Sequence, residues 1–264
     1  MLPFSIIWNV DPEIFSLGPL TVRWYGLLFA LAFFFGYLIL SRYFKNENLP
    51  QELLDKLTVY MALAVIIGAR LGHCFFYEPA YYLANPAEVL MIWRGGLSGH
   101  GAAITILLVL YVFSRKIKKP YLWVIDRVVV IIALGGFFIR TGNLMNSEIY
   151  GIETSLPWGF IFVNRGEILP KHPTQIYEAL SYLAIFFLLN TLYWKKSIRE
   201  TKGFIFGVFL TLLFTVRFLI EFIKEPQVEF EKAMLLNMGQ ILSLPLIIAG
   251  IIIFASAYKK WKSQ

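Results

Sequence analysis

The stretch VVVIIALGGFFIRTGNLMNSEIYG (residues 128–151) sets a long apolar run directly against a crowd of polar side chains. Arg140, Asn143, Asn146 and Glu148 follow one another closely at its polar end. Because an apolar run of about 20 residues is long enough to cross a bilayer, the first part predicts a membrane span. Ionisable groups at the end of such a span are costly, so the second part is a candidate functional site.

The composition of the whole chain indicates the same class of protein. Hydrophobic residues make up 58% of the 264 residues, aromatic residues 17% and charged residues 16%, and the mean hydropathy is +0.65. Soluble domains carry about 25% charged residues. We therefore expect an all-α, polytopic membrane protein in which residues 1–264 form a single transmembrane domain.

The apolar stretches predict seven transmembrane helices. Their approximate bounds are 20–40, 57–77, 97–113, 121–140, 175–194, 203–223 and 235–258. Pro245 should kink the last of them without ending it, because neighbouring helices can satisfy the carbonyl that it frees. The longest connection between spans, 141–174, is expected to form a small external cap between helices four and five.

Lysine and arginine are unevenly shared between the two sets of connections. Most follow the first, third and fifth spans or lie in the C-terminal tail. The opposite connections carry only Arg94, Arg165, Lys171, Lys224 and Lys232. Since cytoplasmic loops are enriched in Lys and Arg, the pattern predicts an N-terminus outside and a C-terminus in the cytoplasm. This topology explains the net charge of +7, so no nucleic-acid partner is expected.

The cysteine and histidine content argues against a metal centre. The single cysteine, Cys74, excludes an intrachain disulfide and any site built from several cysteines. The three histidines show no His-x-His or His-x-x-x-His spacing. The sequence therefore predicts neither a metal ion nor a cofactor.

Polar residues from five predicted spans converge near the outer interface. A random scatter would have put some of them at the cytoplasmic ends, so the convergence indicates a site. Two arginines with a histidine nearby suit an anionic headgroup, because guanidinium groups bind phosphate through several donors. The converging residues are Tyr25, His100, Arg140, Gln175, Tyr177, Glu178, Arg217 and Glu221.

Each of these residues also has a structural interpretation. Arg217 and Glu221 are spaced i, i+4 and could simply neutralise each other. Arg140 could extend to the interface, and His100 could be structural. The glycines of RGGLSGHGAA (94–103) either let helices pack closely or leave room for a ligand beside His100.

Three further ionisable residues within the spans have structural interpretations. Arg70, in GARLGH, lies deeper in the second span and could be a charge partner in helix packing. Asp126 and Arg127 lie near the cytoplasmic end of the fourth span and are predicted to form a structural pair.

The motif RTGNLMNSEIYG (140–151) resembles the signature of bacterial prolipoprotein diacylglyceryl transferases. Ile139 and Leu144 replace a glycine and a phenylalanine of that signature, but no charged position is lost. Further similar motifs follow in family order over nearly the whole chain. They are RWYGL (23–27), GARLGHCFFYEPAYYL (68–83), GGLSGHG (95–101), HPTQIYEAL (172–180), RFLIEF (217–222) and MGQILSLP (238–245).

The resemblance implies a reaction at the outer face of the bacterial cytoplasmic (inner) membrane. A diacylglyceryl group passes from phosphatidylglycerol, a membrane lipid, to the lipobox cysteine of a prolipoprotein signal peptide. A thioether forms and glycerol phosphate leaves, without a cofactor. By the same resemblance the catalytic residues are His100, Arg140, Arg217 and Tyr25. The residues that shape the substrate-binding site are Asn143, Asn146, Glu148, Gly151 and Glu221.

A membrane transporter of an anionic solute is the alternative from another functional class. Arginines at the outer ends of several helices would suit such a protein. It predicts an inverted repeat and helices interrupted near the midplane of the membrane. The sequence shows neither convincingly.

Overall fold

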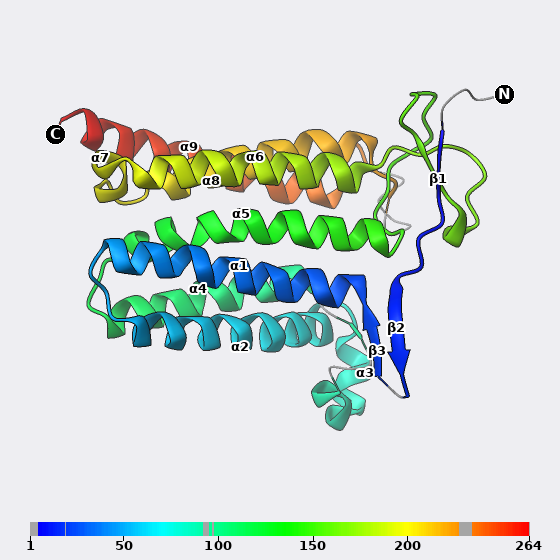
Figure 1. Ribbon diagram of the computed structural model, residues 1–264, viewed down its shortest axis with the longest axis horizontal. Coiled ribbons are helices and arrows are strands. Elements are labelled where there is room, and N and C mark those ends of the chain that lie inside the picture. Colours follow the sequence, from blue (N-terminus) through cyan, green and yellow to red (C-terminus); the bar gives the residue numbers. More distant parts are fainter. Residues whose placement is uncertain (1–4, 19, 92–94, 97, 227–233, 264) are drawn as a thin grey trace. The chain divides into compact units, whose positions relative to one another are not determined.

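The computed structural model describes residues 5–18, 20–91, 95–96, 98–226 and 234–263 (Figure 1). The chain divides into two compact units, of which the first joins Met1–Ile39 to Asp126–Gln264 and the second is Leu40–Ile125. The long helices are α1 (Trp24–Asn46), α2 (Gln51–Phe76), α4 (Gly99–Lys116), α5 (Tyr121–Met145), α6 (Thr174–Trp194), α8 (Phe204–Ile220) and α9 (Met238–Lys262). The short helices are α3 (Pro79–Ala84), α7 (Lys196–Glu200) and the 3-10 helices η1 (Pro86–Leu90), η3 (Val163–Arg165) and η4 (Glu221–Ile223).

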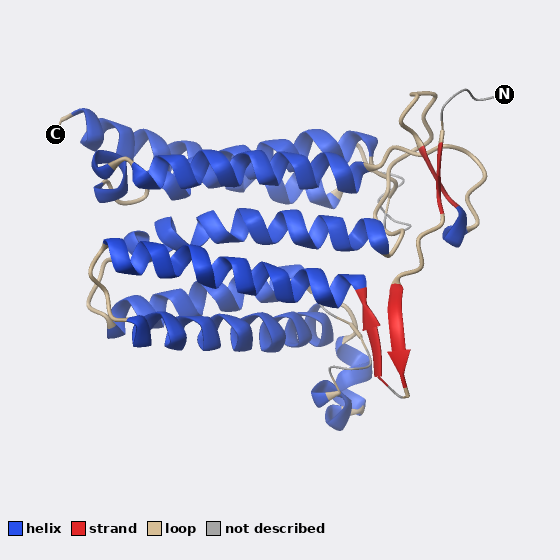
Figure 2. Ribbon diagram, viewed as in Figure 1, coloured by secondary structure: helices blue, strands red, loops and turns tan. Residues whose placement is uncertain are grey.

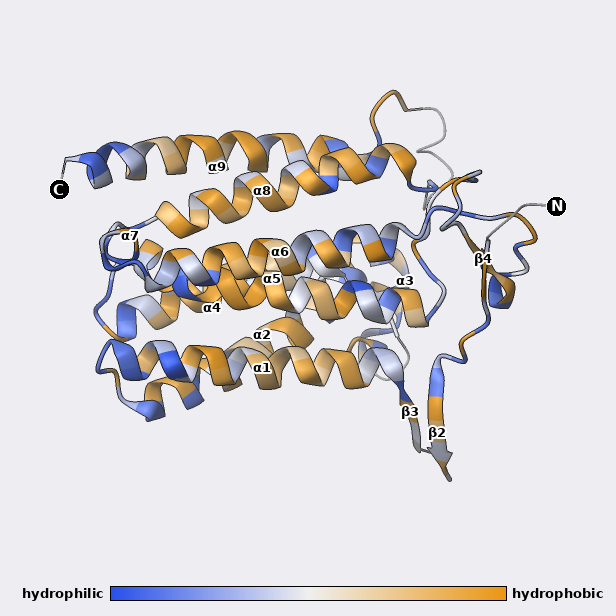
Figure 3. Ribbon diagram, turned by 45° about the horizontal axis from the view of Figure 1, so that its top comes forward, coloured by the Kyte–Doolittle hydropathy of each residue, from blue (hydrophilic) through white to orange (hydrophobic). Residues whose placement is uncertain are grey.

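The protein is a multi-pass membrane protein. Six of its described helices are long and apolar enough to cross a membrane, namely α1, α2, α5, α6, α8 extended by η4, and α9. Figure 3 shows hydrophobic residues along most of the length of these helices. Six of the seven predicted spans are thereby confirmed as helices of membrane-spanning length. The third corresponds to α4, an 18-residue helix outside this group, so a seventh span stays a prediction.

Several helix boundaries differ from the predicted ones by up to six residues, and two of these differences bear on the site. Helix α5 runs to Met145 rather than to residue 140, so Arg140 and Asn143 lie on a helix. Helix α1 begins at Trp24 rather than at residue 20, because residues 20–23 form a strand. Helix α9 continues through Pro245, as expected.

The all-α expectation misses the short strands that the described residues contain (Figure 2). They are β1 (Ile6–Trp8), β2 (Glu13–Leu17), β3 (Leu20–Arg23) and β4 (Phe160–Phe162). Strands β2 and β3 form an antiparallel pair in which Leu17 lies opposite Leu20, and β1 pairs in parallel with β4. A segment of three to five residues is too short for its sequence pattern alone to separate a strand from the start of a helix.

In the first unit, helices α6, α8 and α9 pack side by side (Figure 1). Small residues permit the close approach of α8 and α9. A Cβ atom added at Gly207 would lie 2.6 Å from the backbone nitrogen of Phe254, and one added at Gly250 would lie 2.7 Å from the nitrogen of Thr211. Close backbone contact at glycines is the usual way in which membrane helices pack.

The start of α8 is capped by an acidic side chain from another helix. The backbone amide of Gly203 donates to Asp126 Oδ2 at 2.6 Å, and that of Phe206 donates to Asp126 Oδ1 at 2.8 Å. Asp126 is 1% exposed. Asp126 thus accepts hydrogen bonds from helix-end amides, and its pairing with Arg127 stays a prediction.

The connection between α5 and α6 (146–173) is called the cap segment here. It carries β4 and η3 and has a small apolar core of its own, formed by Leu144, Phe160 and Phe162 with Trp8 packed against them. The indole of Trp8 donates to the carbonyl of Leu144 at 3.1 Å. The cap segment is therefore a folded structure that is tied to the end of α5.

In the second unit, glycines bring α2 and α4 into close contact. A Cβ atom at Gly72 would lie 2.6 Å from the Cα of Gly101, and one at Gly101 would lie 2.2 Å from the carbonyl oxygen of Gly68. For Gly101 the structure therefore favours the helix-packing interpretation over room for a ligand.

Arg70 has a different role from the predicted charge partner. Its guanidinium is 3% exposed and donates to the carbonyls of Glu88 at 2.5 Å, Val89 at 3.0 Å and Gly95 at 2.6 Å. The carbonyls of Glu88 and Val89 belong to η1, and that of Gly95 belongs to the connection between η1 and α4. Arg70 thus holds a loop in place by satisfying its backbone acceptors.

Candidate active site

The polar residues at the end of α5 form one hydrogen-bonded group. Arg140 Nη1 donates to Asn143 Oδ1 at 3.1 Å, three residues further along the helix. Asn143 Nδ2 donates to Glu148 Oε1 at 2.8 Å, and Asn146 Nδ2 donates to the same oxygen at 3.3 Å. The chain turns back after Met145 with a positive φ of 52° at Ser147, which brings Glu148 to the asparagines.

Arg140 is also the first member of a series of ion pairs that joins three helices and η4. Its Nε lies 2.9 Å from Glu178 Oε2 on α6. Glu178 Oε1 lies 3.1 Å from Lys224 Nζ, and Lys224 Nζ lies 3.2 Å from Glu221 Oε1. Glu221 Oε1 in turn lies 3.8 Å from Arg217 Nη2 on α8. We call these five residues the ion-pair chain.

The ion-pair chain has a buried centre, and the arginines at its two ends are more accessible. Side-chain exposure is 0% for Glu178 and 2% for Lys224, but 12% for Arg140 and 31% for Arg217. When all five groups are ionised, three cations face two carboxylates and one positive charge is left over. Buried charges are costly unless they are paired, and the two arginines at the ends are the members most open to a ligand.

Two neighbouring side chains support this arrangement. The hydroxyl of Tyr182 donates to Glu178 Oε1 at 3.3 Å. Gln175 Nε2 donates to the carbonyl of Glu148 at 2.7 Å, which ties the start of α6 to the end of α5. Both residues are buried, and both come from the first two to three turns of α6.

Two more of the predicted site residues lie in this region at close contacts with the backbone. Tyr25 packs on Gly142, and Gly151 packs on Ile223. A Cβ atom at Gly142 would lie 2.7 Å from Tyr25 Cδ2, so the tyrosine ring packs against α5 between Arg140 and Asn143. A Cβ atom at Gly151 would lie 2.3 Å from the carbonyl oxygen of Ile223. The first unit therefore brings together eight of the nine predicted residues: Tyr25, Arg140, Asn143, Asn146, Glu148, Gly151, Arg217 and Glu221.

His100, the ninth predicted residue, belongs to the second unit. It is the second residue of α4 and is exposed. Ser98 caps this helix by accepting a hydrogen bond from the amide of Gly101 at 3.3 Å. The role of His100 stays a prediction.

Sequence reasoning missed the two central members of the ion-pair chain as site residues. Glu178 was recognised only as one of the converging polar residues, and Lys224 only as an outer cation. The other outer cations Arg94 and Lys232 lie outside the described residues. Gly239, within the motif MGQILSLP, was not among the predicted site residues, yet a Cβ atom there would lie 2.3 Å from Glu221 Oε1.

A second cluster of charges lies in the cap segment. Lys171 Nζ contacts Glu225 Oε1 at 2.6 Å, Glu167 Oε2 at 3.5 Å and Glu153 Oε1 at 3.8 Å. Burial lowers the pKa of Lys171, but the carboxylates of Glu225 and Glu167 outweigh this effect, so the pKa lies above its ordinary value. Lys171 is therefore charged at neutral pH and ties the cap segment to the chain that follows η4.

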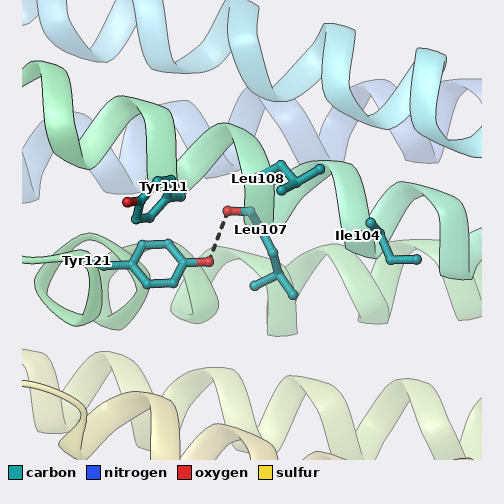
Figure 4. Close-up of a pocket in the computed structure, with 5 residues that line it drawn as sticks. All are labelled: Ile104, Leu107, Leu108, Tyr111 and Tyr121. Atoms are coloured by element: carbon teal, nitrogen blue, oxygen red, sulfur yellow. Dashed lines mark hydrogen bonds between the residues drawn. The ribbon is translucent and has the colours of Figure 1, made fainter.

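The described residues contain no group of three or more His, Cys, Asp or Glu side chains placed to hold a metal ion. An apolar groove of about 420 Å³ lies in the second unit (Figure 4). Its lining residues are Ile104, Leu107, Leu108, Tyr111 and Tyr121. The hydroxyl of Tyr121 donates to the carbonyl of Leu107 at 2.9 Å, and the other lining side chains apart from Tyr111 are aliphatic.

Comparison with known proteins identifies the family. The model of the family described as prolipoprotein diacylglyceryl transferase matches residues 12–256. A protein of Tolumonas auensis is 46% identical over 256 residues, which cover 97% of this chain and 98% of that protein. Proteins of Chloroherpeton thalassium and Porphyromonas gingivalis are 44% and 46% identical, and the alignments cover 97% and 98% of this chain and 95% and 96% of those proteins. All three carry the name phosphatidylglycerol–prolipoprotein diacylglyceryl transferase. The chain belongs to the prolipoprotein diacylglyceryl transferase family.

Proposed function

We propose that this protein transfers the diacylglyceryl group of phosphatidylglycerol to a prolipoprotein, at the lipobox cysteine of its signal peptide. The observation that carries the proposal is the ion-pair chain in a member of this family. It presents Arg140 and Arg217 as accessible ends of a buried network with one excess positive charge. That arrangement suits the single negative charge of a phosphodiester headgroup. No observation favours a transporter of an anionic solute.

The reaction follows from the charge that develops on the leaving group. The cysteine sulfur, as the thiolate, attacks the carbon of the diacylated glycerol that bears the phosphate. A carbon–sulfur bond forms, the carbon–oxygen bond breaks, and its electron pair leaves with the phosphate oxygen. The singly charged phosphodiester thereby becomes a doubly charged glycerol phosphate. Arg140 and Arg217 are placed to compensate this increase in charge.

The remaining predicted residues hold the headgroup and Arg140. Asn143 accepts from Arg140, and Glu148 accepts from Asn143 and Asn146, so these three residues orient one guanidinium. Their polar groups also suit the glycerol hydroxyls of the headgroup. By the family resemblance Tyr25 completes this site.

His100 is the proposed base that removes the thiol proton, because imidazole titrates near neutral pH. We expect His100→Gln to lower the rate most strongly near neutral pH and least at alkaline pH, where water and hydroxide ionise the cysteine. The pH profile of kcat/KM measures this. An unchanged profile with full activity would exclude the role.

The test of the function uses the purified protein with phosphatidylglycerol and a peptide that contains a lipobox. Mass spectrometry of the peptide should show a gain of one diacylglyceryl group. Phosphatidylethanolamine in place of phosphatidylglycerol should give no gain, since its headgroup lacks the net negative charge. A chelator should leave the gain unchanged. A folded protein that retains phosphatidylglycerol but never modifies the peptide would refute the proposal.

The proposed topology places α4 as a seventh span, the N-terminus outside and the C-terminus in the cytoplasm. It puts the ion-pair chain and the cap segment at the outer face of the bacterial cytoplasmic (inner) membrane. The distribution of lysine and arginine supports it, and so does the position of these residues at the ends of α5 and α8 and the start of α6.

Thiol labelling in intact cells tests this topology. We expect an impermeant maleimide to label Ser155→Cys, in the exposed part of the cap segment, and to label Ser263→Cys only after permeabilisation. The native Cys74 is buried and should give little background. Labelling of Ser263→Cys alone in intact cells would reverse the orientation.

A further inference from the structure

Lys224 occupies the centre of the ion-pair chain. It directly follows η4, and its side chain is 2% exposed. Its ammonium donates to Glu178 Oε1 at 3.1 Å and to Glu221 Oε1 at 3.2 Å. Each of these carboxylates also contacts an arginine. Lys224 thus lies between the two carboxylates on which the two arginines depend.

The cap segment fixes the backbone of Lys224. Gly151 and Lys224 are partners in an antiparallel bridge. The amide of Ile152 donates to the carbonyl of Ile223 at 2.9 Å. The amide of Glu225 donates to the carbonyl of Tyr150 at 3.4 Å. The approach is closest at Gly151, where a Cβ atom would lie 2.3 Å from the Ile223 oxygen. A side chain at position 151 would therefore displace the chain that carries Lys224.

We propose that Lys224 is a positioning residue of the transfer reaction, held by the cap segment through Gly151, and that it leaves Arg140 and Arg217 able to bind phosphate. This inference rests on the proposed function. Without the ammonium, two buried carboxylates would face two guanidinium groups, and each guanidinium would be neutralised by its own carboxylate. With it, the ion-pair chain keeps one positive charge for the substrate.

The proposal predicts which kinetic constant changes. The phosphodiester carries one negative charge in the bound substrate, and the second develops only as the carbon–oxygen bond breaks. An interaction that strengthens in the transition state affects kcat more than KM. Removing the charge of Lys224 should therefore lower kcat strongly while KM for phosphatidylglycerol changes little.

The protonation of Lys224 supplies a second readout. Its surroundings come from four elements. The charged or titratable side chains that face it are Arg140 (α5), Glu178 and Tyr182 (α6), Arg217 (α8) and Glu221 (η4). Burial lowers the pKa of Lys224 below its ordinary value; the two carboxylates oppose this shift and the two guanidinium groups add to it.

As the pH rises, Lys224 therefore loses its charge at a lower pH than free lysine does. The rate of the native protein should then decline at alkaline pH. Arginine stays protonated up to about pH 12, so Lys224→Arg should move this decline to higher pH.

The experiment measures peptide diacylglyceryl transfer as a function of phosphatidylglycerol concentration and pH. We expect Lys224→Met to lower kcat about tenfold or more while KM changes less than about threefold. Lys224→Arg should restore kcat to within about threefold of the native value. The matched control is Lys116→Met, which removes a lysine that donates to the Tyr60 hydroxyl at 3.0 Å in the second unit and should leave kcat nearly unchanged.

A double-mutant cycle tests the link to the cap segment. Gly151→Ala should lower kcat in the same way as Lys224→Met. Because both changes act on one ammonium, the double variant should lose little more than the more impaired single variant. Additive losses would show that Gly151 acts elsewhere and would overturn the proposed link.

Three results would overturn the role of Lys224 itself. They are a native kcat in Lys224→Met, a Lys224→Arg variant that is as impaired as Lys224→Met, or an equal loss in Lys116→Met. Failure of the underlying function looks different, because the native protein would then give no product at all. Native mass spectrometry of retained phosphatidylglycerol, which needs no turnover, confirms that each variant is folded and binds lipid.

Discussion

Arg140→Ala should lower kcat/KM for diacylglyceryl transfer by about a thousandfold. Loss of one donor to a developing negative charge costs about 100- to 1000-fold in known enzymes. Here the substitution also leaves the carboxylate of Glu178, which is 0% exposed, with one fewer cation. The peptide mass assay, run at several phosphatidylglycerol concentrations, measures the effect.

Graded variants separate charge from geometry at this position. Arg140→Lys keeps the charge but not the planar, multidentate donor, so an intermediate loss is expected. Asn143→Ala removes the side chain that accepts from Arg140 and should cost about tenfold. The control is Arg23→Ala, whose guanidinium pairs with Glu13 on the surface at 3.0 Å and should be dispensable. An Arg140→Ala protein within tenfold of native activity would contradict the proposed role.

Asp126→Ala should cause a large loss of stability with no direct effect on the chemistry. The first amides of a helix have no partner within the helix, and Asp126 accepts from two amides at the start of α8 at 2.6 and 2.8 Å. A buried carboxylate at a helix N-terminus also interacts favourably with the helix dipole. We expect the free energy of unfolding to fall by about 3 kcal/mol.

Thermal unfolding in detergent, followed by circular dichroism, measures this loss. Asp126→Asn keeps one side-chain oxygen that can accept a hydrogen bond, so its loss should be clearly smaller. At a temperature where the variants remain folded, the transfer rate per folded molecule should match that of the native protein. An unfolding midpoint of Asp126→Ala equal to the native value would show that the cap contributes nothing.

At the end of α5, the sequence predicts the membrane span but not the last residue of the helix. The span before Arg140 was predictable because apolar length alone reports the thickness of a bilayer. The sequence predicts the end of α5 at residue 140, earlier than the observed Met145, because the apolar run stops where the polar side chains begin. In the structure Arg140 and Asn143 continue the helix, and their polar groups are satisfied by Glu178 and Glu148.

By itself, the sequence determined that the protein is a membrane protein of apolar helices and which family its motifs resemble. Only the tertiary structure decided the partners of Lys224. Its partner Glu178 lies 46 positions away in the chain, and no local pattern reveals which carboxylate an ammonium will face. The same holds for Gly151, where the backbone of Ile223 leaves no room for a side chain. Helical periodicity and apolar length are local properties, whereas the partners of a buried charge depend on which distant segments fold around it.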